Sequence, residues 1–247
     1  VKTFTVGYGR KDSSFNETAQ ARLISGHFRS DHSEHLLEPD PRTIIEKLAA
    51  TFDEPFADAS AIPNFLVTAE ARKKVTVALT GVGGDEFFGG YPRHLGARLM
   101  PIYLKLPQAL REGFWSAARL LPESRSAKNM PGRIKRFFSG GRGDFRDAYD
   151  SWISYFGPEE RARLYASARS GAAGSAPRLP GRLDSPDDIF AYELRNYLSD
   201  DLLCLADRVS MSNSLELRVP FLDVRLAGLL ASAPLALKTR GFTLKAL

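Results

Sequence analysis

The sequence has one cysteine, Cys204, in 247 residues, which excludes an internal disulfide. Its neighbours Leu202, Leu203 and Leu205 favour a small core residue over a nucleophile. No apolar run approaches the roughly 20 residues that a membrane-spanning helix needs, and no signal peptide opens the sequence. We therefore expect a protein of the reducing cytoplasm with no membrane partner.

Acidic charge is in mild deficit. The formal net charge is +5, it comes largely from arginine, and much of it is concentrated between Arg125 and Arg146. Basic charge suits a nucleic acid, an anionic nucleotide or a solvated face. Few aromatic residues interleave with these charges and no nucleic-acid-binding signature stands out, so we expect a solvated face and no nucleic-acid partner. The hydrophobic content of 43% and charged content of 26% are ordinary for a globular protein.

The most informative stretch is KVTVALTGVGGDEFFGGYP, residues 74–92. Its segment Val75–Leu79 is apolar and rich in β-branched residues, which predicts a parallel strand buried on both faces. Gly81, Gly83 and Gly84 follow, and glycines let the backbone adopt positive φ and let a ligand approach the main chain. Open α/β sheets bind ligands at the carboxyl ends of their strands, so this stretch predicts a ligand site.

Two acids follow the glycines directly. Glycine loops that bind phosphate usually carry a lysine, but Asp85 and Glu86 would repel a naked phosphate. Mg²⁺ resolves this conflict, because one or two carboxylates bind it together with phosphate oxygens. The stretch therefore predicts a site for a Mg²⁺-nucleotide or Mg²⁺-pyrophosphate, with Asp85 as the metal ligand and Glu86 pointing to a different side. The alternative is a turn whose acids cap the next helix and favour its dipole.

Strands and helices alternate over the first third of the chain. The predicted strands and helix starts are, in order, Thr3–Tyr8, Asn16, His32–Glu38, Asp40 with Pro41, and Ser60. This alternation predicts βαβ crossovers and a doubly wound parallel sheet. From His94 onward the apolar pattern becomes helical. We therefore expect an α/β portion over residues 1–93 and a largely helical portion of the same domain over residues 94–247.

The stretch from Asp207 to Asp223 places charges among apolar residues without a clean period. Charged side chains in such surroundings are seldom fully buried unless they are paired. We interpret Asp207, Arg208, Glu216 and Arg218 as members of internal ion pairs. The alternative is that one of them faces the nucleotide.

Two further stretches resemble functional sites without matching them, and a third predicts a loop. His27, His32 and His35 fit no zinc-binding spacing. Ser139–Asp144 is rich in glycine but follows a basic segment rather than a buried strand, which argues against a phosphate loop. Gly171–Pro186, rich in Gly, Ala, Ser and Pro, predicts a mobile loop.

Two long motifs carry a family resemblance. ALTGVGGDEFFGGYPR at residues 78–93 and DRVSMSNSLELRVPFLD at residues 207–223 resemble the hallmark segments of the synthetase domain of the glutamine-hydrolysing asparagine synthetase B family. DEPFADASAIP at residues 53–63 and the opening TFTVGY also fit. The resemblance spans essentially the whole chain and implies an ATP-pyrophosphatase fold, of the PP-loop or adenine nucleotide alpha hydrolase-like type.

The resemblance implies an ATP-dependent ligase that forms an amide. It would adenylate the side-chain carboxylate of aspartate, and ammonia from a glutaminase domain that hydrolyses glutamine would displace AMP to give asparagine. The implied ATP-binding residues are Val6, Thr80, Gly81, Gly83 and Gly84. The implied catalytic residues are Asp85, at the pyrophosphate with Mg²⁺, and Glu86 beside it.

Parts of the family pattern fall outside the 247 residues. They are an SGGxDS loop expected before Thr3, a lysine-bearing segment expected beyond Leu247, and the N-terminal glutaminase domain. We therefore expect a piece of a longer protein that makes no asparagine by itself, with a homodimer as one candidate assembly. Val82 stands where the family commonly has an acid, so one alternative is a related ligase for another carboxylate. The other alternative is a non-catalytic binding protein that keeps the fold.

Overall fold

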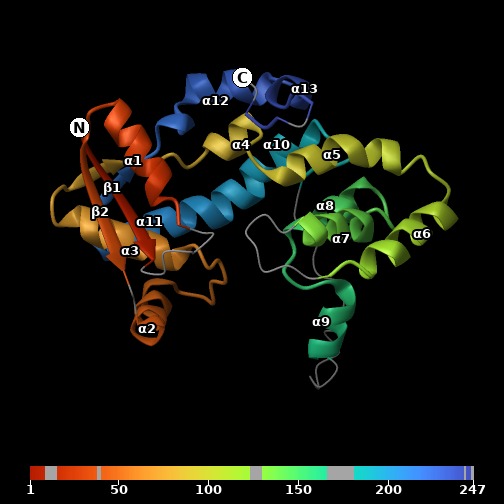
Figure 1. The fold of residues 1–247 in the computed structure, drawn as a ribbon, viewed down its shortest axis with the longest axis horizontal. Coiled ribbons are helices and arrows are strands. Elements are labelled where there is room, and N and C mark those ends of the chain that lie inside the picture. The colour runs from red at the N-terminus through yellow and green to blue at the C-terminus, as the bar shows by residue number, and fades with distance from the viewer. Residues whose placement is uncertain (9–15, 38–39, 123–129, 166–180, 242, 246–247) are drawn as a thin grey trace. The chain divides into compact units, whose positions relative to one another are not determined.

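We describe the protein from a computed structural model (Figure 1). The structure describes residues 1–8, 16–37, 40–122, 130–165, 181–241 and 243–245. The chain divides into two compact units, Val1–Gly83 with Leu198–Asp223 and Gly84–Tyr197 with Val224–Leu247. The predicted division at residue 93 stays a prediction.

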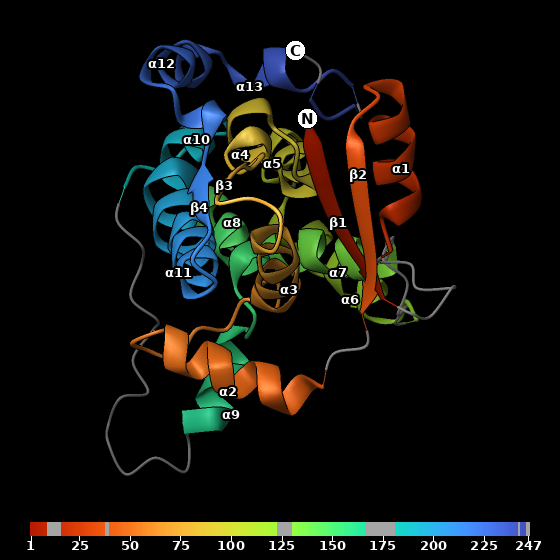
Figure 2. The same cartoon turned by 90° about the vertical axis from the view of Figure 1, so that its left-hand side faces the viewer.

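A parallel βαβ element opens the first unit. β1 (Lys2–Tyr8) pairs in parallel with β2 (Asp31–Leu37) over the full length of both strands. α1 (Thr18–His27) connects them, and the Asn16 side chain accepts a hydrogen bond from the N–H of the first helical residue at 3.2 Å. The two strands lie side by side in Figure 2. This is the crossover that the alternating pattern predicts.

Two further helices of this unit begin where the sequence predicts. α2 (Pro41–Thr51) starts after Asp40, whose carboxylate accepts from the next helical N–H groups at 3.2 and 3.4 Å. α3 (Ala61–Arg72) follows Ser60 and packs on β1. A hydrophobic cluster joins α3 to α11 (Cys204–Ser212), and its buried members are Phe52, Ala61, Leu205 and Val209. Cys204 packs against this cluster, as predicted for a small core residue.

The strand before the glycine-rich loop is short and accessible. β3 (Val77–Leu79) pairs in parallel with β4 (Glu216–Arg218), and the outer two of its three residues are exposed. The parallel direction is confirmed, but the prediction of a strand buried on both faces is wrong, because a two-stranded sheet leaves side chains uncovered. The described strands form two separate two-stranded sheets. An α/β fold with parallel strands is thus confirmed.

The ion-rich stretch is paired but not internal. Arg218 Nε lies 2.8 Å from Glu216 Oε1, and these side chains are 65% and 54% exposed. Arg208 pairs with Asp53 at 2.7 Å, again in accessible surroundings, and Asp207 is exposed. The prediction of internal pairs is therefore wrong. Its physical reason is strand geometry, since residues two apart in β4 share one face and here that face is the solvated one.

The second unit is helical over its described residues, apart from an isolated bridge. Its helices are α4 (Gly84–Phe88), α5 (Pro92–Tyr103), α6 (Gln108–Arg119), α7 (Met130–Gly140), α8 (Phe145–Ile153), α9 (Pro158–Tyr165), α10 (Asp188–Glu193), α12 (Val224–Ser232) and α13 (Leu235–Lys238). The π-helical η1 (Leu194–Leu203) continues from α10 into the first unit, where the short 3-10 helix η2 (Pro220–Leu222) follows β4. The helical pattern predicted after His94 is confirmed.

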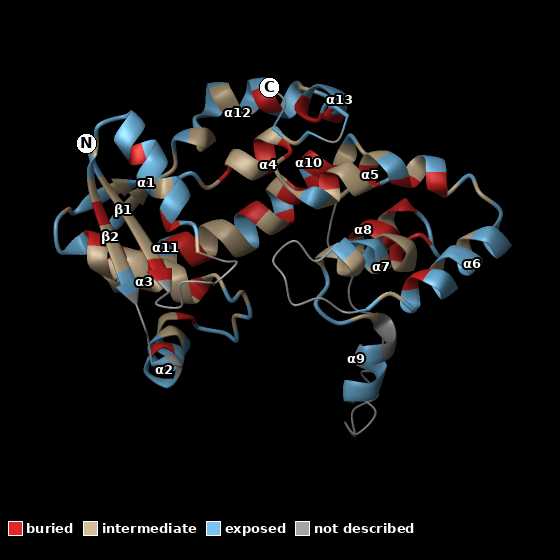
Figure 3. Ribbon diagram, in the orientation of Figure 1, coloured by how far each residue is buried: buried red, intermediate tan, exposed pale blue. Residues whose placement is uncertain are grey.

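The core of the second unit lies where α5, α8 and α10 meet. Its buried members are Ala97, Met100, Tyr103, Phe145, Ala148, Tyr149, Leu183, Ile189 and Tyr192. Figure 3 shows these helices with their buried residues in red. No described helix is long and apolar enough to cross a membrane.

The stretches that resemble functional sites have ordinary partners. Ser139–Asp144 joins α7 to α8, and Asp144 caps α8 by accepting from the Asp147 N–H at 2.7 Å. His32 contacts the Thr3 hydroxyl at 3.0 Å, and His35 lies 3.5 Å from a Glu70 oxygen. Most of the predicted mobile loop, and the first part of the basic stretch from residue 125, lie outside the described residues.

Asp201, in η1, provides a pH test of the first unit. Burial and the charge of Asp58 raise the pKa of Asp201 from 3.8 to about 6. A carboxyl group with a raised pKa in the folded state stabilises the fold when protonated, and this contribution is lost as pH rises through about 6. Asp201→Asn should therefore stabilise the chain by about 1 kcal/mol at neutral pH, after allowing for solvent screening, and by little near pH 4. Urea denaturation at both pH values measures this difference, and an equal effect at both would contradict it.

Candidate active site

The predicted loop leaves β3 at its carboxyl end and turns into α4. The Thr80 N–H donates to the Arg218 carbonyl at 3.0 Å, which extends the β3–β4 pairing by one residue. Gly83 follows with a φ of +92°, a conformation that other residues rarely adopt. α4 begins at the next residue, Gly84. The strand, glycine turn and helix therefore occur in the order that the sequence predicts.

The predicted site residues fall in both units. Val6 lies near the carboxyl end of β1, and Thr80 follows the carboxyl end of β3, both in the first unit. Open parallel sheets bind ligands at such strand ends. Asp85 and Glu86 lie in α4 of the second unit. The chain crosses from one unit to the other between Gly83 and Gly84, in the middle of the loop.

Asp85 forms an ion pair at a half-exposed position. Its Oδ1 lies 2.8 Å from Lys245 Nζ, and the side chains of Asp85 and Lys245 are 40% and 55% exposed. Gly90 packs beneath this pair, because a Cβ at that position would overlap the Asp85 carboxylate and lie 2.6 Å from Lys245 Cε. The second glycine pair of the motif thus leaves space for an acid and its counter-ion.

Glu86 has different surroundings from its neighbour. It is only 2% exposed, and its carboxylate accepts a hydrogen bond from the Tyr91 hydroxyl. Burial and then Glu86 raise the pKa of Tyr91 well above its ordinary range, so the phenol keeps its proton and acts as a donor. Asp85 is therefore the accessible acid of the pair, and Glu86 is the internal one.

A buried polar cluster behind Tyr91 centres on Glu193, which the sequence analysis did not single out. Glu193 is 1% exposed and its carboxylate meets Arg93 Nε at 2.5 Å, His94 Nε2 at 2.8 Å and the Tyr149 hydroxyl. His94 Nδ1 accepts from the Tyr91 N–H at 3.4 Å, so Nε2 is the nitrogen that donates to Glu193. The Arg93 guanidinium also stacks on the Tyr91 ring, 3.8 Å from its centroid.

Glu193 remains ionised despite its burial. Desolvation by itself would raise its pKa, but the hydrogen bond from His94 and the charge of Arg93 hold the pKa of Glu193 below its ordinary value. Burial alone would lower the pKa of Arg93, and the Glu193 charge raises it instead. The two groups therefore form a mutually dependent buried charge pair. The sequence signal that could have identified it is a polar residue in the apolar helical stretch from residue 189.

A second polar group lies beside the glycine pair. Lys238, at the end of α13, is fully buried, and its Nζ lies 3.5 Å from the Phe190 ring centroid. Burial lowers the pKa of Lys238 to about 8. Gly89, with a φ of +69°, packs against it, since a Cβ there would lie 3.3 Å from Lys238 Cβ. In this glycine pair, Gly89 therefore provides the positive φ of the turn, and Gly90 leaves space for Asp85.

The donor set fits Mg²⁺ at Asp85 better than at Glu86. Mg²⁺ takes hard oxygen ligands and keeps several waters, so one accessible carboxylate with phosphate oxygens suffices. Asp85 provides such a carboxylate, which in this structure pairs with Lys245, whereas Glu86 is internal. Among the described residues no group of three His, Cys, Asp or Glu side chains could bind a metal without a substrate. The residues present thus fit a metal that arrives with its phosphate.

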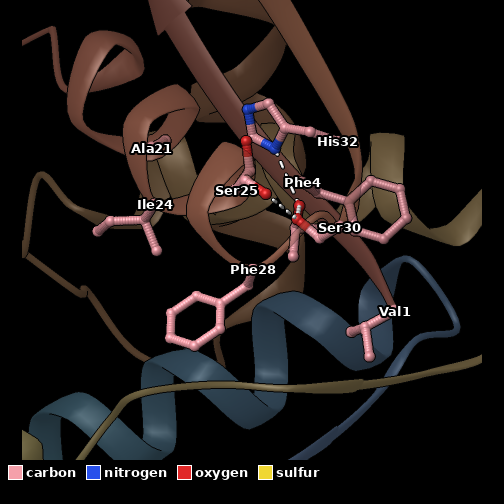
Figure 4. A pocket seen from close by; sticks show the side chains of 9 residues that line it. Val1, Phe4, Ala21, Ile24, Ser25, Phe28, Ser30 and His32 are labelled. Carbon is pink, nitrogen blue, oxygen red and sulfur yellow. Dashed lines mark hydrogen bonds between the residues drawn. The ribbon is translucent and has the colours of Figure 1, made fainter.

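A hollow of about 510 Å³ lies elsewhere in the first unit (Figure 4). It is lined by Val1, Thr3, Phe4, Ala21, Ile24, Ser25, Phe28, Ser30 and His32. These residues lie on α1, on the connection that follows it, and at the amino-terminal ends of β1 and β2, opposite the ends at which parallel sheets bind ligands. None of the predicted site residues lines it.

The fold and this loop define an α/β protein with parallel strands whose glycine-rich strand end leads into an acidic helix. The asparagine synthase family model matches residues 1–247, so the chain belongs to the asparagine synthase family.

Curated relatives extend beyond the matched region. The chain is 28% identical to asparagine synthetase (glutamine-hydrolyzing) 1 of Bacillus subtilis over 251 residues, which covers 99% of this chain and 38% of that protein. It is 30% identical over 250 residues to a Mycobacterium bovis protein named "Putative asparagine synthetase (glutamine-hydrolyzing)", covering 98% of this chain and 37% of that protein. The chain thus spans little more than a third of the length of these relatives.

Gly90→Ala tests whether Gly90 makes room for Asp85. The added methyl overlaps the Asp85 carboxylate, so the variant should separate Asp85 from Lys245. It should lose about 1 kcal/mol or less of stability, because the displaced groups are the ends of half-exposed side chains that can move. Denaturant melts measure the loss. Gly113→Ala is the matched control, because a Cβ there meets nothing within 4 Å, and it should be neutral or slightly stabilising in α6. Equal effects of the two changes would contradict the packing.

Glu193→Ala tests the buried charge pair. Removal of the carboxylate leaves the Arg93 charge buried, so the variant should lose about 3–5 kcal/mol. Glu216→Ala breaks an exposed pair and should lose less than about 1 kcal/mol. Urea midpoints of the two variants give the comparison. A small loss from Glu193→Ala would show that solvent reaches the Arg93 guanidinium.

Proposed function

We propose that this chain is the ATP-dependent synthetase part of a glutamine-hydrolysing amide-forming ligase. In this proposal ATP adenylates the side-chain carboxylate of aspartate, pyrophosphate leaves, and ammonia displaces AMP to give asparagine. The ammonia comes from glutamine hydrolysed by an N-terminal glutaminase domain of the full-length protein. Membership of the asparagine synthase family supports this reaction class. The names of the relatives support glutamine as the nitrogen source.

The observation that carries the proposal is the accessible Asp85 at the start of α4, directly after the glycine turn that ends β3. A carboxylate there can approach a metal-bound pyrophosphate. Lys245, now paired with Asp85, offers a cationic group that the phosphates can also attract. We propose Asp85 as the catalytic metal contact, with Glu86 in the same site on its internal side.

Mg²⁺ bound at Asp85 would neutralise charge that develops on the leaving pyrophosphate. The chain's own part is to present one accessible carboxylate, for which the absence of a side chain at Gly90 leaves space. Thr80 and Gly81 follow the carboxyl end of β3, where their backbone and hydroxyl can meet the nucleotide. We propose that Val6, near the carboxyl end of β1, lines the adenosine pocket. We propose that Gly83 and Gly84 let the phosphates approach the main chain closely.

The same proposal includes a larger sheet. β1 and β3 lie in separate two-stranded parallel sheets. A doubly wound sheet of the PP-loop type would place the carboxyl ends of both strands along one edge. Parallel strands and the βαβ order of β1, α1 and β2 are what such a sheet requires.

The test uses the full-length protein with Asp85→Asn and with Glu86→Gln. Asp85→Asn keeps the size of the side chain and removes its charge, so aspartate-dependent pyrophosphate release should fall by roughly a hundredfold or more. Glu86→Gln keeps an oxygen that accepts from Tyr91, so its pyrophosphate release should fall by roughly tenfold or less. Thermal melts of both variants control for folding. Near-normal release by Asp85→Asn at saturating Mg²⁺ would place the metal contact elsewhere.

Substrate comparison tests the acceptor separately. Pyrophosphate release by the unmodified full-length protein is measured with aspartate, glutamate and a non-amino dicarboxylate. Release that depends on aspartate supports asparagine formation. Release only with another carboxylate would show a related ligase with a different acceptor. Val82, which stands where the family commonly has an acid, is the reason for this alternative.

A further inference from the structure

The two neighbouring acids of α4 are mechanically linked. Successive residues of a helix project about 100° apart, so the direction of one side chain fixes the direction of the next. Glu86 points into the protein and Asp85 reaches the accessible side, where it meets Lys245. Whatever fixes Glu86 therefore also aims Asp85.

The described group that fixes the Glu86 carboxylate is the Tyr91 hydroxyl. Tyr91 follows the glycine pair, and Gly90 closes the turn by donating its N–H to the Asp85 carbonyl at 2.9 Å. The phenol hydrogen bond thus joins the far end of this turn to α4. It closes a loop of six residues, from Glu86 to Tyr91, directly after the accessible acid.

Tyr91 itself is held from two directions. Its ring lies under the Arg93 guanidinium, and its backbone N–H contacts His94 Nδ1 at 3.4 Å. Arg93 and His94 both donate to the two oxygens of the buried Glu193, at 2.5 and 2.8 Å. The circuit from Tyr91 through Arg93, Glu193 and His94 back to Tyr91 leaves the phenol little freedom to rotate.

We propose that Tyr91 is a positioning residue that aims Asp85 through Glu86. The inference rests on the proposed function, because it takes Asp85 as the metal contact. Tyr91 does not touch the reacting groups in this proposal. Because the Glu193 cluster holds Tyr91 in place, the Tyr91 hydroxyl holds Glu86, and the direction of Asp85 on the other side of α4 follows.

Tyr91→Phe tests this in the full-length protein, because it keeps the ring under Arg93 and removes only the hydroxyl. The apparent KM for Mg²⁺ in pyrophosphate release should rise by about tenfold or more, as when a group that orients a metal ligand is lost. kcat at saturating Mg²⁺ should change by less than about threefold, because excess metal compensates for a misdirected ligand. Tyr103→Phe is the matched control. It also loses a phenol hydrogen bond in this unit, to the Arg111 carbonyl, and should leave the Mg²⁺ dependence unchanged.

Hydrogen–deuterium exchange gives a readout without metal, nucleotide or turnover. In Tyr91→Phe the amides of residues 84–90 should exchange faster, while those of the core helix α8 keep their rates. A double-mutant cycle then asks whether Tyr91 acts through Glu86. In a Glu86→Ala background, Tyr91→Phe should add less than about twofold to the KM for Mg²⁺, because its partner is already gone.

The outcomes separate this inference from the proposed function. Absence of aspartate-dependent release by the unmodified protein would overturn the function, and the exchange measurement would still test the link between Tyr91 and α4. An active protein whose Tyr91→Phe variant keeps both its Mg²⁺ dependence and its exchange rates would overturn the positioning role alone. Equal, additive effects of Tyr91→Phe with and without Glu86 would also overturn it, because Tyr91 would then act by another route.

Discussion

A carboxylate with 1% exposure keeps its charge only where donors surround it, and the second unit provides Glu193 with three. Arg93, His94 and Tyr149 come from α5 and α8, while Glu193 ends α10. The desolvation cost of one ion would be prohibitive by itself, so each charge depends on the other. The same contacts hold the segment after the second glycine pair, and through it the turn that carries the acids.

The glycines of the motif have separate physical roles. Gly83 adopts a positive φ where the chain turns out of β3, and Gly90 leaves room for the carboxylate of Asp85. The acids divide in the same way, with Glu86 internal and Asp85 accessible. The glycines and the acids of the motif are therefore not equivalent to one another.

Local chemistry accounts for the features that could be predicted. Asp40 and Asn16 accept hydrogen bonds from free N–H groups at helix starts, and these partners lie at most three positions away in the sequence. The burial of β3 could not be predicted in this way. Apolar β-branched residues suit an accessible strand as well as a covered one, and the number of partner strands is decided by the rest of the fold. The pairing of Glu216 with Arg218 is likewise exposed because of the face on which β4 presents them.

The sequence by itself determined the order of helices and parallel strands, the glycine turn, the acid pair and, through two long motifs, the family. These features depend on neighbouring residues or on whole-segment similarity. Only the tertiary structure decided how far each acid is exposed and which residues contact it. Arg93 and Glu193 are 100 residues apart in the sequence, and Asp85 pairs with Lys245, which lies near the carboxyl end of the given sequence. No local periodicity encodes such contacts, because they arise when helices pack and buried charges must find partners.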